Sequence, residues 1–192
     1  MARIRTFLAI DLGPAVRKRL ASFQNELADD APDVNWVEDE NLHITLIFLG
    51  DIDERESITV CRAAQKVTAA MAPFPVTMEG VGCFPNTRRP RVVWVGVSDG
   101  ADELGELHHL LESKLEELGL YRPEMRAFKP HVTLGRIKGE GSTEALVQTL
   151  AKNKEWSAGE ATVREVLIMS SELTRDGPNY TILGRAKLTG EA

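Results

Sequence analysis

Cysteine and long apolar runs are both scarce in this 192-residue sequence. The two cysteines, Cys61 and Cys83, have neither metal-ligand nor disulfide-framework spacing, so we expect two reduced, mostly buried thiols. No run approaches the ~18 apolar residues that a membrane-spanning helix needs. The apolar stretch at residues 7–10 is interrupted by Asp11, which favours a first β-strand over a signal peptide. A cytoplasmic protein with no membrane partner is therefore expected.

An excess of positive charge is also missing, because 23 Lys and Arg face 29 Asp and Glu, for a formal net charge of −6. Such a chain is poorly suited to coating long nucleic acids through phosphate neutralisation, although it could still grip one phosphate or one strand end. The 43% hydrophobic and 27% charged residues are ordinary for a soluble globular protein. At this length we expect one domain, or one domain built from two related halves.

Only four histidines are present, and two of them lie in matching sequence motifs. Residues 43–46 read His-Ile-Thr-Leu and residues 131–134 read His-Val-Thr-Leu. Histidine is the one side chain whose unperturbed pKa lies near neutral pH. A pair of imidazoles can therefore transfer two protons, one as an acid and one as a base. The other two, His108 and His109, lie next to each other on a predicted helix and are interpreted as solvated surface.

The remaining segments alternate between strand-like and helix-like patterns. Strands are predicted over residues 4–11, 36–37, 42–49, 74–84, 91–97, 131–137, 163–172 and 180–188, with a turn at 176–179 before the last. Helices are predicted over residues 14–27, 53–71, 101–118 and 142–152, and Ile58, Cys61 and Ala64 mark one face of the second. This mixture favours an α+β domain with antiparallel pairing, and the repeated phrase indicates two lobes related by an approximate two-fold axis.

Strand alternation gives the repeated phrase a chemical meaning. His43 and Thr45 share one face, while Phe48 and its apolar neighbours point to the other and can bury. His131 and Thr133 are arranged alike. If the two strands are neighbours, two imidazoles and two hydroxyls line one groove. That composition suits a phosphoryl group, because hydroxyls donate to its oxygens while one histidine takes a proton and the other gives one.

Two plainer interpretations compete with this one. A single histidine on a strand is usually an ordinary polar residue, but two copies with Thr and Leu at the same offsets argue against coincidence. The histidines could instead bind a metal, yet neither motif carries an acidic or cysteine partner, which makes a poor zinc set. We therefore expect no metal and no cofactor.

The sequence around both motifs resembles that of the 2H phosphoesterase superfamily. Within it, the chain is most similar to the RNA 2′,3′-cyclic phosphodiesterases of bacteria and archaea, also called 2′-5′ RNA ligases. The similar stretches cover residues 5–10, 36, 42–50, 80–85, 91–97, 128–136, 171–173 and 177–180.

This resemblance implies a bilobal α+β fold, with two pseudo-symmetric lobes of antiparallel sheet and flanking helices around a central cleft. Residues 1–192 would form a single domain of two intertwined lobes. The implied reaction is metal-independent hydrolysis of an RNA 2′,3′-cyclic phosphate to a 2′-phosphate, with minor reversible 2′-5′ ligation. The implied partner is an RNA with a cyclic phosphate end, tRNA fragments included, and we expect a monomer.

The resemblance also implies roles for individual residues. His43 would donate a proton to the departing 3′-oxygen, and His131 would accept one from water. Thr45 and Thr133 would hold the non-bridging phosphate oxygens. Arg136 matches an arginine expected near the phosphate, but simple alternation puts it on the opposite face from His131. It would need the strand to end or bulge there, or its long side chain to reach round.

Basic and aromatic residues near the motifs suggest a path for RNA. The basic ones could offset the global charge locally and steer a strand end toward the cleft; they are Arg88, Arg89, Arg91, Arg122, Arg126 and Lys129. Phe84, at the mouth of the basic loop, is the candidate for stacking a terminal base.

Two other functions stay open from the sequence. One is an enzyme of the same superfamily that acts on small cyclic nucleotides or 2′-5′ oligonucleotides. The other is a non-catalytic protein that binds RNA ends. The intact His and Thr residues of both motifs argue against this second function.

Overall fold

The computed structural model describes residues 3–31, 33–139, 143–174 and 177–191. Its strands are β1 Ile4–Asp11, β2 Val34–Trp36, β3 His43–Ile52, β4 Phe74–Phe84, β5 Val92–Val97, β6 His131–Ile137, β7 Ser157–Val163, β8 Glu165–Thr174 and β9 Gly177–Lys187. Its helices are α1 Gly13–Ala28, the 3₁₀ turn η1 Asp39–Asn41, α2 Glu54–Thr68, α3 Ala101–Glu117 and α4 Glu144–Lys152.

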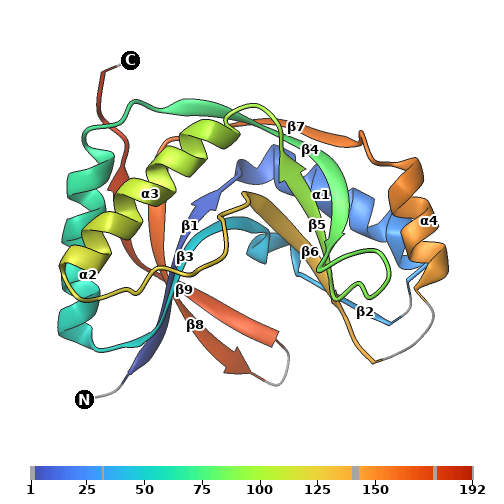
Figure 1. Ribbon diagram of the computed structural model, residues 1–192, viewed down its shortest axis with the longest axis horizontal. Coiled ribbons are helices and arrows are strands. Elements are labelled where there is room, and N and C mark those ends of the chain that lie inside the picture. The colour runs from blue at the N-terminus through green and yellow to red at the C-terminus, as the bar shows by residue number, and fades with distance from the viewer. Residues whose placement is uncertain (1–2, 32, 140–142, 175–176, 192) are drawn as a thin grey trace.

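All nine of these strands join one antiparallel sheet, in the order β7-β4-β5-β6-β3-β1-β8-β9 with β2 paired to β6. Strands β7, β4, β5 and β6 form one half, strands β3, β1, β8 and β9 form the other, and the halves meet where Ile44 of β3 pairs with Val132 of β6. Figure 1 shows this curled sheet with helices at both ends of the molecule. The predicted α+β class with two lobes of antiparallel sheet is confirmed.

The helices cross between the two halves. Helix α1 follows β1 in the chain but packs against β7 of the other half. Helix α3 follows β5 but packs against α2 and β3, while α2 also lies on β8 and β9 and α4 lies on β4 (Figure 1). Each half of the sheet is therefore covered by one helix that comes, in the chain, directly after a strand of the other half.

Helix α2 begins where the sequence provides a strong start signal. The Asp53 carboxylate accepts a hydrogen bond from the backbone of Glu56, and the Glu56 carboxylate accepts one from the backbone of Asp53, which is a capping box. Of the predicted buried face, Ala64 is buried, but Ile58 is 47% exposed and Val60 is fully buried instead. The buried residues of this helix are Val60, Ala63, Ala64 and Thr68, so its buried face is shifted from the predicted one and leaves Ile58 outside it.

The C-terminal strands differ from the prediction in two respects. Strand β7 was missed because its segment is rich in small residues and carries little apolar signal, yet it pairs with β4 along its whole length. The predicted turn at 176–179 lies partly outside the described residues, and residues 177–179 belong to β9, paired with β8. The predicted helix start at residue 142 also lies outside them. Within the described ranges, no helix is long and apolar enough to cross a membrane.

A bulge in β3 changes which side chains share a face. Ala9 of β1 pairs with Thr45 and Leu8 pairs with Ile47, which leaves Leu46 as an extra residue in β3. Leu46 and Ile47 are consequently both buried, and Phe48 turns outward.

Strand β6 carries a matching bulge. Trp94 of β5 pairs with Thr133 and Val93 pairs with Gly135, which leaves Leu134 as the extra residue. Counted from its histidine, β6 has the same sequence of partly buried, buried and exposed positions as β3. The two His-x-Thr-Leu motifs are thus alike in backbone geometry as well as in sequence.

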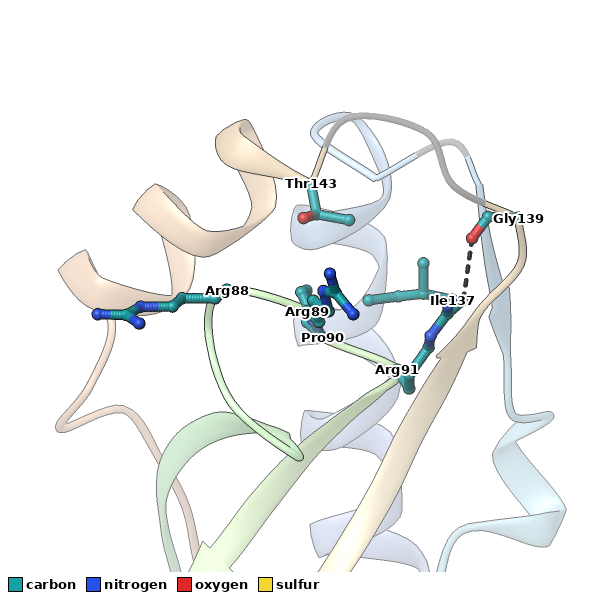
Figure 2. A pocket seen from close by; sticks show the side chains of 7 residues that line it. All are labelled: Arg88, Arg89, Pro90, Arg91, Ile137, Gly139 and Thr143. Atoms are coloured by element: carbon teal, nitrogen blue, oxygen red, sulfur yellow. Dashed lines mark hydrogen bonds between the residues drawn. The ribbon is translucent and has the colours of Figure 1, made fainter.

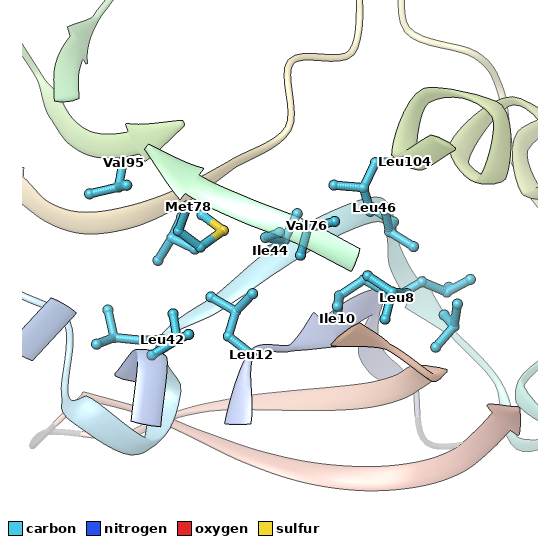
Figure 3. Packing of buried hydrophobic residues seen from close by; sticks show 14 of the residues in the cluster. Leu8, Ile10, Leu12, Leu42, Ile44, Leu46, Val76, Met78, Val95 and Leu104 are labelled. Atoms are coloured by element: carbon cyan, nitrogen blue, oxygen red, sulfur yellow. The ribbon is translucent and has the colours of Figure 1, made fainter. Parts of the chain in front are cut away.

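The hydrophobic core continues from one half to the other. Ile44 and Val132 are both fully buried at the seam, and the buried residues around them belong to a single cluster. Figure 3 shows side chains from β1, β3, β4 and β5 packed together with Leu104 of α3. This packing fixes the two motif strands next to each other.

Candidate active site

His43 is the first residue of β3, and both of its ring nitrogens have partners. Nδ1 lies 2.6 Å from the carbonyl oxygen of Asn41, and because a carbonyl can only accept, Nδ1 carries the proton. Nε2 lies 3.0 Å from Oγ1 of Thr45. The ring stacks on Phe7 with centroids 5.2 Å apart and meets the edge of Tyr180 at 5.5 Å. The imidazole is held between strands β1, β3 and β9.

The surroundings of His43 act on its pKa in opposing directions. Burial lowers the pKa of His43 below its ordinary value, while the Asn41 carbonyl and the Asp11 carboxylate raise it. Asp11 is the cross-strand partner of His43 in β1 and forms an ion pair with Arg17.

His131 begins β6 in the same way. Its Nδ1 lies 2.7 Å from the carbonyl oxygen of Lys129, again two residues earlier, so Nδ1 carries the proton and Nε2 of the neutral ring is unprotonated. Burial lowers the pKa of His131, the Lys129 carbonyl raises it, and the positive charge of Arg136 lowers it further. The ring meets Phe84 edge-on, with centroids 5.1 Å apart.

The seam of the sheet brings the two motifs together. Antiparallel counting from the pair at the seam places His43 across from Thr133, and Thr45 across from His131. All four side chains lie on one face, which we call the open face, while the residues between them are buried on the other. The sequence-based placement of two imidazoles and two hydroxyls on one surface is therefore what the structure shows.

Arg136 reaches the open face because of the bulge at Leu134. Without that extra residue it would point away from His131; with it, the guanidinium lies near enough to lower the pKa values of both His131 and Tyr180. Burial acts on the Tyr180 phenol in the opposite direction, and more strongly, so that its pKa is raised overall. Of the ways in which Arg136 could reach the site, a bulge is the one the strand uses.

The prediction that Phe48 would be buried is wrong. The bulge at Leu46 turns it to the open face, where it is 43% exposed. Its ring stacks on Phe7 with centroids 5.5 Å apart, and the guanidinium carbon of Arg5 lies 5.1 Å from the ring centre. Beside it is a cavity of about 400 Å³, lined by Phe48, Leu49, Gly119, Leu120, Tyr121, Arg122 and Glu124.

Phe84 lies nearer to the histidines than its position at the basic loop suggested. Its ring packs against Trp94, with centroids 5.1 Å apart, as well as against His131. Arg122 and Arg126 are exposed, and Arg122 lines the cavity beside Phe48.

Two further expectations have different outcomes. His108 is not simply solvated, because its ring stacks on Phe128 at 4.2 Å and burial lowers its pKa, whereas its neighbour His109 is exposed. Cys61 and Cys83 are free thiols, and burial raises the pKa of each. In the part of the chain that the structure describes, no three His, Cys, Asp or Glu residues are grouped so that they could hold a metal ion.

Sequence reasoning missed two kinds of contributor to the site. The carbonyls of Asn41 and Lys129 both precede a histidine by two positions, a spacing that is visible in the sequence. Asp11 and Tyr180 come from other strands, and although Tyr180 ends the family-like stretch 177–180, no local signal links either residue to a histidine. Together these groups fix both imidazoles with Nε2 available for proton transfer, beside hydroxyls and a guanidinium suited to an anion.

A two-lobed antiparallel sheet with a His-x-Thr strand from each lobe at its centre defines the two-histidine phosphoesterase class. The chain matches the family model of the 2′-5′ RNA ligase superfamily over residues 12–175, and it belongs to that superfamily.

Similar proteins of known sequence and structure agree with this assignment. The RNA 2′,3′-cyclic phosphodiesterase of Methanothermobacter thermautotrophicus is 35% identical, covering 93% of this chain and 96% of its own length. That of Archaeoglobus fulgidus is 38% identical, covering 92% and 96%. The crystal structure of TT0787 of Thermus thermophilus superposes with a TM-score of 0.81 at 30% identity, covering 98% of this chain and all of that one.

Escherichia coli LigT in complex with 3′-AMP superposes with a TM-score of 0.79 at 28% identity, covering 97% of this chain and 99% of LigT. These relatives confirm the prediction that the chain is an enzyme of the phosphodiesterase class.

Proposed function

We propose that this enzyme hydrolyses RNA 2′,3′-cyclic phosphate ends to 2′-phosphates by metal-independent acid–base catalysis with His43 and His131. The observation that carries the proposal is the matched hydrogen bonding of the two imidazoles. Each donates from Nδ1 to the carbonyl two residues earlier, which leaves both Nε2 atoms on the open face. The names of the curated relatives support the same substrate.

The charged neighbours of the two histidines support opposite roles. Burial lowers both pKa values, but Asp11 raises that of His43 whereas Arg136 lowers that of His131. A neighbouring carboxylate favours the imidazolium form, and a neighbouring guanidinium favours the neutral imidazole. On this ground we assign His43 as the proton donor and His131 as the proton acceptor.

The proposed reaction is one displacement at phosphorus. Nε2 of His131 takes a proton from water as the water oxygen bonds to phosphorus. The bond from phosphorus to the 3′-oxygen breaks, and that oxygen takes the proton from Nε2 of His43. The products are a 2′-phosphate and a 3′-hydroxyl, and one proton has moved from His43 to His131. Solvent exchange restores both imidazoles.

Three side chains stabilise the phosphate in this scheme. Thr45 and Thr133 donate their hydroxyl protons to non-bridging oxygens, and Arg136 donates two charge-assisted hydrogen bonds as charge builds on the phosphorane. Before the transfer, the Nε2–H of protonated His43 can donate to Oγ1 of Thr45, 3.0 Å away, which frees the hydroxyl proton for the phosphate; the 3′-oxygen then takes over this Nε2–H as it leaves. Phe84 remains our candidate for stacking the terminal base, although its ring already packs on His131.

Minor 2′-5′ ligation follows from the same arrangement. If a 5′-hydroxyl replaces water as the nucleophile, His131 takes its proton and the 3′-oxygen still leaves. The phosphate then joins the 2′-oxygen to the incoming 5′-oxygen. The monomeric state, cytoplasmic location and use of tRNA fragments stay predictions.

The decisive experiment is product analysis with EDTA present. A hexanucleotide that ends in a 2′,3′-cyclic phosphate is incubated with the enzyme, and the terminal nucleotide is identified by ³¹P NMR. We expect full activity in EDTA and a 2′-phosphate product. A 3′-phosphate product would reverse the identity of the leaving oxygen, and activity lost in EDTA and restored by a divalent cation would overturn the metal-independent mechanism.

A further inference from the structure

A second basic site lies beyond the catalytic residues, near the start of β5 and the end of β6. It is a cavity of about 350 Å³ (Figure 2), lined by Arg88, Arg89, Pro90, Arg91, Ile137, Gly139 and Thr143. The residues come from the β4–β5 loop, from the end of β6 and from the residue before α4. None of them takes part in the proposed chemistry.

The loop that carries the arginines is fixed by hydrogen bonds. Oδ1 of Asn86 accepts from the backbone N–H groups of Arg88 and Arg89, at 3.0 and 3.1 Å. Nη1 of Arg91 donates to the carbonyl of Gly139 at 3.0 Å, and the backbone of Ile137 donates to the Arg91 carbonyl at 3.0 Å. The loop is thereby tied to the end of β6, and the cavity lies between them.

The arginines differ in their direction. In Figure 2 the Arg89 side chain lies between Thr143 and Arg91, whereas Arg88 extends away from the cavity. The guanidinium of Arg91 uses one donor on Gly139 and keeps others, since a guanidinium has five N–H groups. Two guanidinium groups and one hydroxyl, from Thr143, can therefore donate to one anion.

Among the residues that the structure describes, no carboxylate compensates the charge of this cavity. Over the residues that the structure describes, neither Arg89 nor Arg91 is within ion-pair distance of a carboxylate, and no acidic residue lines the cavity. In a chain of net charge −6, a cluster of three arginines around one cavity is a local exception. Arginine is the side chain whose planar donor pairs match phosphate oxygens.

The row of polar and basic side chains on β6 ends next to this cavity. His131, Thr133 and Arg136 follow one another along β6 on the open face, whereas the next residue, Ile137, turns to the opposite face and lines the cavity, so an RNA strand that reaches both must pass over the end of β6. On β5, Gly96 pairs with His131, and Arg91 lies five residues further along. At ~3.3 Å per residue, the cavity is about 17 Å from the row of His131.

We infer that this cavity binds a backbone phosphate of the RNA, upstream of the cyclic phosphate, so that the enzyme prefers strands to mononucleotides. The inference rests on the proposed function. Along the axis of a stacked helix, one strand has a phosphate every ~3.4 Å, so a span of about 17 Å along that axis corresponds to about five nucleotides, and to fewer if the strand is extended. The bound group is a phosphodiester held by Arg89, Arg91 and Thr143.

The test compares substrates of increasing length. We measure kcat/KM for cytidine 2′,3′-cyclic phosphate and for oligocytidylates of two, four, six and eight nucleotides with the same end. For the wild type, kcat/KM should rise once the strand reaches the cavity. The Arg89→Ala variant should lose about 10-fold or more of that rise and leave the mononucleotide rate unchanged, since one charge-assisted hydrogen-bonding group is removed.

Salt dependence provides a second measurement. For the octanucleotide, the slope of log kcat/KM against log salt concentration should become shallower by about 0.7 in Arg89→Ala, because one phosphate contact of a single strand is lost. Arg89→Lys should keep most of the slope but not the full affinity. Arg62→Ala, an exposed arginine on α2, is the matched control and should change neither quantity.

The outcomes separate this inference from the proposed function. If the mononucleotide is hydrolysed but length has no effect, or if Arg89→Ala weakens all lengths equally, the cavity is not a strand site. If no cyclic phosphate is hydrolysed, the proposed function fails. The cavity is then tested by fluorescence anisotropy with a 5′-labelled octanucleotide, where equal Kd values for wild type and Arg89→Ala overturn the inference.

Discussion

His43 and His131 hold the same hydrogen bond, from Nδ1 to the carbonyl two residues earlier, yet their charged neighbours have opposite signs. Asp11 raises the pKa of His43 and Arg136 lowers that of His131, although burial lowers both. The opposite proton roles that we propose for these near-identical motifs therefore rest on the charges of neighbouring residues, which differ around them.

The two histidines should control opposite limbs of the pH profile. Replacing either one by Ala should lower kcat by about 10²- to 10⁴-fold without unfolding the protein. The residual rate of His131→Ala should lose its acidic limb, because the base that must be neutral is gone. That of His43→Ala should lose the alkaline limb. Circular dichroism checks the fold, and the opposite pattern of limbs would exchange the two roles.

The profile of the free enzyme should lie at lower pH than that of the complex. Burial lowers both imidazole pKa values in the free enzyme, which kcat/KM reports. A bound phosphate anion favours the imidazolium form and raises both pKa values in the complex, which kcat reports. We expect the optimum of kcat/KM on the acidic side of the optimum of kcat. Coincident optima would contradict this account of the charges.

Arg136 should act on rate and on pH dependence together. Arg136→Gln removes the positive charge that lowers the pKa of His131, so the acidic limb of kcat/KM should move to higher pH. It should also reduce kcat/KM by about 10- to 100-fold, since a charge-assisted contact to phosphate is lost. Arg136→Lys should restore the limb but not the full rate. A reduced rate with an unmoved limb would place the arginine away from His131.

The matching bulges in β3 and β6 determine which side chains of these two strands reach the open face. Simple alternation correctly placed His43 and Thr45 on one face, because these residues precede the bulge. It failed for Phe48, which was predicted buried and is exposed, because Leu46 adds one residue to the strand. The same extra residue in β6 brings Arg136 to the site. A bulge is set by how a strand meets its partner, so the sequence of one strand does not reveal it.

Gly135 should be required for the packing behind the β6 bulge. A β-carbon there would lie 2.5 Å from Cγ1 of Val34 and 2.9 Å from Cε3 of Trp36, so Gly135→Ala should lower the free energy of unfolding by about 1–3 kcal/mol. The matched control is Gly105→Ala on α3, where no atom lies within 4 Å of the added carbon. That change should raise the free energy of unfolding by about 0.5–1 kcal/mol. Urea denaturation measures both, and equal signs would contradict the comparison.

The whole molecule is organised by the seam between β3 and β6 and by the exchange of helices across it. The two halves share one buried cluster, and α1 and α3 each pack on the half opposite to the strand that precedes them. We therefore propose that the lobes form a single cooperative domain.

Unfolding should report this domain as one transition. All three tryptophans, Trp36, Trp94 and Trp156, lie in the half that contains β6, so their fluorescence follows that half, whereas far-UV circular dichroism follows both. The two signals should give coincident urea midpoints. Ile44→Ala at the seam should lower both together, by about 2–5 kcal/mol in the free energy of unfolding. Separate midpoints would show two independently folding lobes.

The sequence by itself determined the residue types of the site, the repeated phrase, most of the helices and strands, and the family. These features depend on local patterns, such as alternation, capping and turn residues, that act within a few positions of each other. Tertiary structure alone decided that Arg136 faces His131, that Phe48 is exposed, and which charge stands beside each histidine. Those outcomes depend on strand register and on residues far apart in the chain, because the burial and charges that set a pKa come from whatever the fold packs against it.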